Sequence, residues 1–143
     1  MAFYIKPQLR VRHGAEMSET HEQRFGIRQG CPLSPYLFVL VMHVMFWDIK
    51  ERSGNQINRG AVPGLSFAEI LYADDTLLIL RTKEALEKLL HEIELESEYY
   101  GLRLNLKKCE LIEMNGNQDI KFRSGEKMKK AEKAQYLGGI LTK

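Results

Sequence analysis

The chain has 143 residues, a length suited to one domain with a hydrophobic core. Its 44% hydrophobic content argues against wholesale disorder, and its net charge of +2 does not by itself require a nucleic-acid partner. Cys31 and Cys109 form neither a zinc-binding spacing nor a secreted disulfide framework, so we expect an intracellular, reducing compartment.

The first half of the chain predicts a hairpin followed by a helix. Apolar and basic residues alternate over residues 9–12, which indicates a strand, and residues 13–16 can turn it back toward a second strand at 22–26. Ser34 is a good N-cap and Pro35 suits the first helical position, so we predict a core helix over residues 35–52 that Gly54 can end.

The apolar residues of this helix cover more than one face, which is typical of a helix buried in the centre of a core. They form the longest apolar stretch of the chain, residues 36–47. That stretch is too short to cross a bilayer, and residues 1–12 lack the apolar segment of a signal peptide. We therefore expect no membrane partner.

Two apolar runs flank residues 72–75 and predict a hairpin over residues 65–80. Asp74 and Asp75 would stand at its tip. Because desolvating an ion costs on the order of several kcal/mol, this pair should face solvent, a cation or both. Carboxylates suit Mg²⁺, but Asp is also a common turn residue, so a plain turn is the alternative.

The second half predicts another helix and several short strands. Thr82 can cap a helix over residues 83–100, and Gly101 can stop it. We predict strands at 102–106, 111–114 and 136–141, with Asn115-Gly116 as a hairpin signal. The expected fold class is α+β, an antiparallel sheet with helices packed on one face.

Residues 26–38 form a loop that combines a glycine, a cation, an amide and a capped helix N-terminus. These groups together favour phosphate, although such a loop could also be an ordinary helix entry. Lysines and arginines also gather between residues 121 and 133, where a solvated surface is an equally good interpretation.

Four motifs in chain order resemble reverse transcriptases, in particular the LINE-type, non-LTR retrotransposon group. They are Arg28-Gln29-Gly30-Cys31-Pro32-Leu33-Ser34-Pro35, Tyr72-Ala73-Asp74-Asp75, Gly101-Leu102-Arg103-Leu104-Asn105-Leu106-Lys107-Lys108-Cys109-Glu110 and Tyr136-Leu137-Gly138-Gly139-Ile140-Leu141. The resemblance covers roughly residues 9–141. It implies that residues 1–143 are a single partial palm domain of an RNA-directed DNA polymerase, with an RNA template and a DNA primer as partners.

By this resemblance, Asp74 and Asp75 are catalytic residues that bind Mg²⁺, and Tyr72 and Ala73 lie under the primer terminus. Lys108 matches a lysine proposed to protonate the leaving pyrophosphate, a general-acid role worth about 10²–10⁴-fold.

The same resemblance implies further nucleic-acid contacts. Arg28, Gln29 and Gly30 match the loop that contacts the template and the incoming nucleotide. Residues 136–141 resemble the primer-grip hairpin, and within them Tyr136, Leu137 and Gly138 are the expected contacts. For Arg28 and the lysines at 107 and 108, a solvated surface charge is the alternative.

The chain also departs from the family pattern. Reverse transcriptases carry another metal-binding Asp on an earlier palm strand, whereas residues 1–12 hold no Asp or Glu. Because Mg²⁺ demands near-ideal octahedral coordination, we expect an incomplete site and no activity from this chain alone, which also lacks fingers and thumb.

A palm without one of its strands leaves an exposed sheet edge, which predicts a complementing chain or a homo-oligomer. The alternative function is a non-catalytic, domesticated module that binds nucleic acid or protein. A decayed element without function is a third interpretation.

Overall fold

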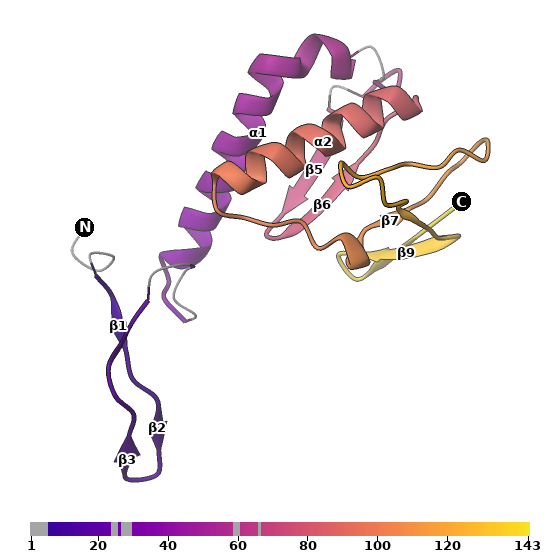
Figure 1. Ribbon diagram of the computed structural model, residues 1–143. Coiled ribbons are helices and arrows are strands. Elements are labelled where there is room, and N and C mark those ends of the chain that lie inside the picture. The colour runs from indigo at the N-terminus through magenta and orange to yellow at the C-terminus, as the bar shows by residue number, and fades with distance from the viewer. Residues whose placement is uncertain (1–5, 24–25, 27–29, 59–60, 66) are drawn as a thin grey trace. The chain divides into compact units, whose positions relative to one another are not determined.

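The computed structural model describes residues 6–23, 26, 30–58, 61–65 and 67–143. The chain divides into two compact units, Met1–Phe38 and Val39–Lys143. Its elements, in chain order, are β1 (Gln8–Leu9), β2 (Arg12–His13), β3 (Glu16–Met17), β4 (His21–Glu22), α1 (Ser34–Asn58), β5 (Glu69–Tyr72), β6 (Asp75–Leu78), α2 (Lys83–Tyr99), the 3₁₀ helix η2 (Leu106–Lys108), β7 (Glu110–Leu111), β8 (Lys129–Lys130), β9 (Lys133–Tyr136) and β10 (Gly139–Thr142) (Figure 1).

The N-terminal unit contains a two-stranded ribbon. β1 pairs antiparallel with β4, and β2 pairs antiparallel with β3. Gly14 has a φ of 62° and reverses the chain between β2 and β3, as the turn predicted at 13–16 requires. All eight strand residues are exposed, so the ribbon buries no core of its own.

Helix α1 begins at Ser34, one residue before the predicted start, and it runs through Gly54 to Asn58 instead of ending near residue 52. Gly54 does not adopt a positive φ, and Ile57 beyond it is buried. Burial of the Ile57 side chain offsets the helix-propensity cost of an interior glycine, about 1 kcal/mol.

The expectation that α1 is buried all round is wrong for this chain. One face, with Met45 and Ile49, is almost fully buried, whereas another face exposes large apolar side chains. The exposed set comprises Tyr36, Val39, Leu40, Val44 and Trp47. The apolar pattern of a helix therefore does not say which of its faces the rest of this chain covers.

Helix α2 follows the sequence prediction closely. The Thr82 hydroxyl accepts a hydrogen bond from the Ala85 backbone N–H at 3.3 Å, and Gly101, with a φ of 71°, follows the helix end. Leu89, Leu90 and Ile93 are buried, as their helical spacing indicates.

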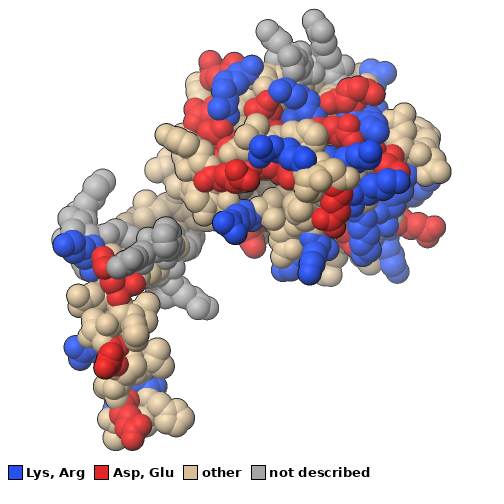
Figure 2. Space-filling view, viewed as in Figure 1, with Lys and Arg blue, Asp and Glu red and all other residues tan. Residues whose placement is uncertain are grey.

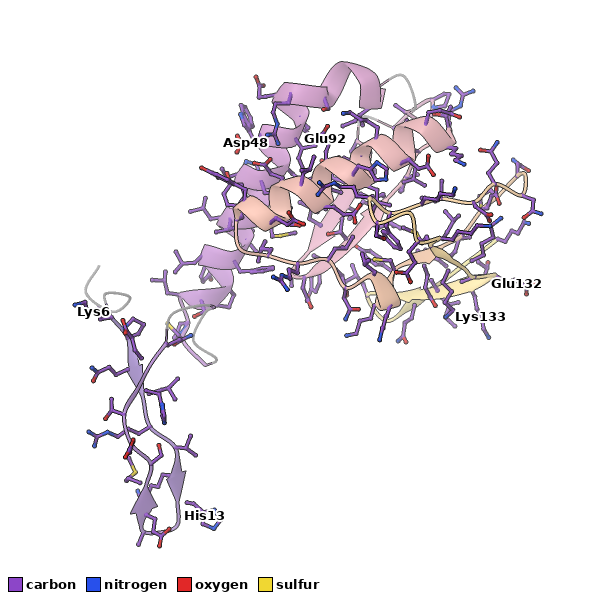
Figure 3. The ribbon with its side chains drawn as sticks, viewed as in Figure 1. Lys6, His13, Asp48, Glu92, Glu132 and Lys133 are labelled. Carbon is purple, nitrogen blue, oxygen red and sulfur yellow. The ribbon has the colours of Figure 1, made fainter. Side chains whose placement is uncertain are left out.

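Polar side chains join α1 to α2. Arg52 forms an ion pair with Glu96, and the Tyr100 hydroxyl donates to Asp48 Oδ2 at 2.7 Å, which raises the pKa of Tyr100 to about 12. A hydrogen bond from Lys88 lowers the pKa of Glu92, which lies on α2 near the crossing of the two helices (Figure 3). These contacts fix the register between the helices.

The segment after α2 differs from the prediction. Residues 102–105 form no strand, and β7 pairs parallel with β8 rather than in a hairpin through residues 115–116. The reason is packing: Ile120 and Phe122 are buried against Leu90, so the chain returns over α2 before β8. Leu104 also packs against this cluster, so the alternating leucines serve the core without forming a ladder.

Three side chains of α2 hold this returning segment by its backbone. Glu87 accepts from Lys121 N and Glu94 accepts from Arg123 N, both at 2.9 Å, while His91 Nε2 lies 2.8 Å from the Lys121 carbonyl oxygen. Side chains of α2 therefore satisfy backbone groups of residues 121 and 123 that a neighbouring strand would otherwise bond.

The basic side chains near residue 130 are largely paired with acids. Lys127 contacts Asp119, Lys130 contacts both Glu113 and Asp119, and a further ion pair joins Lys129 to β7. In Figure 2, Lys and Arg are interspersed with Asp and Glu on the visible face of the larger unit. These pairs favour the interpretation of this region as a mixed, solvated surface.

The α+β class is confirmed, but the expected single antiparallel sheet is not what the described residues form. Their strands make five two-stranded pairs, four antiparallel and one parallel. Each of these strands is only two to four residues long and offers few ladder bonds. Within the described ranges, no helix has the length and apolar character needed to cross a membrane.

Candidate active site at the tip of the β5–β6 hairpin

The predicted hairpin around residues 72–75 is present, with two four-residue strands and a tight turn. β5 and β6 pair in register from Glu69↔Leu78 to Tyr72↔Asp75, which leaves Ala73 and Asp74 as the two turn residues. Residues 72–75 are all exposed, and Tyr72 retains 61% of its accessible surface. Both carboxylates therefore remain hydrated, and no desolvation cost opposes their charge.

The backbone of this turn is strained at Ala73, which has a φ of 49°. A residue with a Cβ in the left-handed region costs roughly 1–2 kcal/mol, and hairpin turns normally place Gly, Asn or Asp there. Backbone strain of this kind is concentrated at functional sites, where it fixes the direction of neighbouring side chains. Ala73 lies directly before the Asp pair.

Asp74 and Asp75 offer hard carboxylate oxygens, the ligands that Mg²⁺ prefers. No hydrogen bond or ion pair within the described part of the chain engages either carboxylate. The same described residues contain no group of three or more His, Cys, Asp or Glu side chains placed to hold a metal ion. The tip therefore fits part of a magnesium ligand set, with two acidic side chains.

A second hairpin, formed by β9 and β10, closes the chain. Its register runs from Lys133↔Thr142 to Tyr136↔Gly139, and its turn residues, Leu137 and Gly138, have φ angles of 51° and 77°. Positive φ at both turn positions matches the twist of the strands. The single strand predicted over 136–141 is therefore wrong, because a turn divides it, whereas the hairpin implied by the family resemblance is present.

A hydrogen bond connects the two hairpins. The Tyr136 hydroxyl lies 3.2 Å from the Ile70 carbonyl oxygen of β5, and Tyr136 is partly buried. Ile70 precedes Tyr72 by two residues. The structure thus brings residues 136–138 and the Asp pair onto neighbouring, connected elements.

Comparison with known proteins identifies the family. A family model described as "Reverse transcriptase (RNA-dependent DNA polymerase)" matches residues 1–141. The chain belongs to the reverse transcriptase family. No solved structure matches it significantly.

Two curated relatives are retrotransposon proteins. The chain is 34% identical over 87 residues to the "Retrovirus-related Pol polyprotein from type-1 retrotransposable element R2" of Nasonia vitripennis, a match that covers 61% of this chain. It is 32% identical over 91 residues to the "Retrovirus-related Pol polyprotein from type-2 retrotransposable element R2DM" of Drosophila melanogaster, a match that covers 64% of this chain. Each match covers 8% of the relative. The similarity supports a reverse transcriptase of the non-LTR type.

Family membership gives the Asp hairpin a chemical context, since reverse transcriptases use divalent metal ions. Lys108, the predicted general acid, lies in η2 and is exposed. No hydrogen bond or ion pair in the described residues connects its side chain to either hairpin. The adjacent Cys109 is not an activated thiol, because burial and the nearby Glu94 raise its pKa.

The loop at 26–38 is only partly described. Arg28 and Gln29 lie outside the described residues, so their predicted contacts stay predictions. Gly30 is exposed with a φ of 82°, a backbone conformation that favours glycine, and it belongs to the N-terminal unit.

The Ile70 carbonyl is a feature that sequence reasoning missed. A backbone acceptor carries no residue signature, and the bond joins positions 66 residues apart. A tyrosine at the end of a strand indicates only a polar group that needs a partner. No pattern in the sequence names that partner.

Proposed function

We propose that this chain supplies the metal-binding hairpin and the primer-contacting hairpin of a reverse-transcriptase palm, for RNA-templated DNA synthesis. The observation that carries the proposal is the exposed Asp74–Asp75 pair on a strained two-residue turn, connected to the second hairpin through Tyr136. Membership of the reverse transcriptase family supports RNA-templated DNA synthesis as the reaction.

The proposed roles follow the family pattern residue by residue. Asp74 and Asp75 would hold Mg²⁺, which when bound stabilises negative charge on a reacting phosphate. The exposed ring of Tyr72 and the backbone at Ala73 would support the primer terminus, and Lys108 would donate a proton to the leaving pyrophosphate.

The nucleic-acid contacts would come from two places. Arg28, Gln29 and Gly30 would contact the template and the incoming nucleotide. Leu137, 51% exposed, and Gly138 would face the primer. A glycine at that position lets a ligand approach the backbone closely.

The backbone of β5 supports the idea of a further strand. The Ile79 N–H donates to the Ala68 carbonyl at 2.8 Å, so Ala68↔Ile79 is a hydrogen-bonded pair. Pairs alternate along an antiparallel ladder, so Glu69 and Leu71 direct their backbone N–H and C=O groups away from β6. We propose that another palm strand pairs along this edge and contributes a third carboxylate, from a longer polypeptide, a complementing chain or a second copy.

Binding of an RNA–DNA hybrid by this chain tests the function. We expect fluorescence anisotropy of a labelled oligo(rA)–oligo(dT) hybrid to rise with protein, and more so with Mg²⁺. Asp74→Asn should remove the Mg²⁺-dependent part, whereas Glu126→Gln, which neutralises an exposed carboxylate in a loop of the same unit, should not. A chain that binds no hybrid under either condition would overturn the proposed function.

Primer extension tests the incompleteness of the site. The chain alone, with an RNA template, a DNA primer and Mg²⁺, should make no templated product. Product that Asp74→Ala abolishes would show that these residues suffice for catalysis. Size-exclusion chromatography with light scattering tests the partner strand, since a monomer at all concentrations would exclude pairing between copies.

The second candidate is a non-catalytic, domesticated module that binds nucleic acid. The observation that favours it is the presence of only two acidic ligands at the hairpin tip, among the residues described. This candidate predicts that Asp74→Asn leaves hybrid binding unchanged with and without Mg²⁺, which separates it from the first.

A further inference from the structure

We propose that Tyr136 is a positioning residue, whose hydroxyl fixes the primer-contacting hairpin on the metal-binding hairpin. This inference rests on the proposed function and deepens it. In this role the Tyr136 hydroxyl bonds the protein backbone, and the Leu137-Gly138 turn contacts the nucleic acid. The Tyr136 Oη atom lies 3.2 Å from the Ile70 carbonyl oxygen.

This bond lies near the turn of each hairpin. Tyr136 is the last residue of β9 before the Leu137-Gly138 turn, and Ile70 lies two residues before the last residue of β5. Two residues of extended strand span about 7 Å, so the bond lies close to the Ala73-Asp74 turn. A change in this bond would therefore move one turn relative to the other.

The Ile70 carbonyl accepts the phenol without losing its place in the ladder. Because Ala68↔Ile79 is a hydrogen-bonded pair, the alternation of the ladder makes Ile70↔Leu77 another one. The carbonyl then directs one lone pair at Leu77 N–H and keeps the second for Tyr136. The contact adds to the β5–β6 hairpin and does not compete with it.

The second hairpin has few other anchors. All four residues of β10 are exposed, and in β9 only Ala134 and Tyr136 are partly buried. In the described part of the chain, β9 pairs with β10 alone, so no shared ladder joins it to β5. The Ala131 N–H donates to the Leu111 carbonyl at 2.9 Å and holds the chain just before β9, so the Tyr136 bond contributes to the placement of this hairpin at its other end, beside the turn.

Tyr136→Phe removes only the hydroxyl and tests the proposal. We expect the melting temperature and Mn²⁺ affinity to stay close to those of the wild type. A hybrid with a recessed primer 3′ end should bind less tightly, by about three- to tenfold relative to a blunt hybrid, which is the scale of one hydrogen bond. A purely structural loss would weaken binding of both hybrids equally.

Hydrogen exchange gives a readout that needs no nucleic acid or metal. In Tyr136→Phe, exchange of the Leu77 and Ile70 amides, which form a hydrogen-bonded pair, should accelerate about three- to tenfold, because β5 loses an external contact. Tyr99→Phe is the matched control, since Tyr99 lies on α2 with 81% of its surface exposed. It should leave both amides and both hybrid affinities unchanged.

The outcomes separate the two proposals. If the wild type prefers the recessed end and Tyr136→Phe retains the full preference, the positioning role is overturned and the proposed function stands. If the wild type binds neither hybrid nor Mn²⁺, the proposed function fails, and the role toward the primer fails with it. Faster exchange in Tyr136→Phe would then establish the hairpin contact as purely structural.

Discussion

The two hairpins of the larger unit have strands of equal length and differ in what they present at the turn. Each has two four-residue strands, a tyrosine at the end of its first strand and a non-glycine residue of positive φ next, Ala73 or Leu137. At the following position, Asp74 carries a carboxylate, whereas Gly138 carries no side chain and has a φ of 77°. The two turns thus differ in backbone as well as in side chain: one presents ligand oxygens and the other a bare backbone.

The hairpins also differ in how the protein holds them. In β5, residues 69–71 are partly buried, and an ion pair ties Glu69 to Lys50 of α1. β10 is exposed along its whole length. Strong anchoring suits a metal-binding element, which must hold its ligands still, and it leaves the second hairpin more dependent on single contacts.

The largest expected effect comes from removing charge at the first turn. Asp74→Asn and Asp75→Asn should each weaken Mn²⁺ or Mg²⁺ binding by about tenfold or more, because a neutral amide replaces an anionic oxygen ligand. Titration of Mn²⁺ followed by electron paramagnetic resonance measures this. Equal Mn²⁺ affinities in the wild type and both variants would remove the chemical distinction between the two turns.

A smaller effect should follow from adding a Cβ to the second turn. Gly138→Ala should destabilise the chain by about 1 kcal/mol, because alanine resists positive φ. Gly139→Ala is the matched control: Gly139 lacks a positive φ, and an added Cβ would lie 3.4 Å from the Tyr136 carbonyl oxygen. Urea unfolding should show the larger shift for Gly138→Ala, and equal shifts would contradict the assignment of strain.

The smallest effect should come from relieving strain at the matching positions. Ala73→Gly and Leu137→Gly should each stabilise their hairpin by about 0.5 kcal/mol, since relief of positive φ exceeds the added freedom of glycine in the unfolded chain. Thermal unfolding measures both. If Ala73→Gly lowers stability, the turn is not strained, and strain does not orient the Asp pair.

Local signals predicted much of this structure. The tight turn between β5 and β6, the Thr82 cap and the Gly101 stop all involve residues that lie close together in the chain. Such short-range effects can be interpreted from sequence because both partners lie within a few residues of each other.

The errors of prediction arose where partners lie far apart in the chain. The leucines at 102–106 alternate like a strand, yet Leu104 and Leu106 pack against the cluster around Ile120 and Phe122. The apolar residues of α1 indicate a buried helix, yet Val44 and Trp47 are exposed. A hydrophobic pattern shows which side chains avoid water, but it does not show what covers them.

The features of the candidate site also divide into those that nearby residues determine and those that the folded structure determines. The four motifs together indicated the family, and Tyr72-Ala73-Asp74-Asp75 indicated the two carboxylates, because this chemistry resides in the side chains and in one short turn. Only the tertiary structure revealed the strain at Ala73 and the bond from Tyr136 to the Ile70 carbonyl. No residue type marks a backbone acceptor or a backbone torsion, so only the folded structure shows which of them contribute to the site.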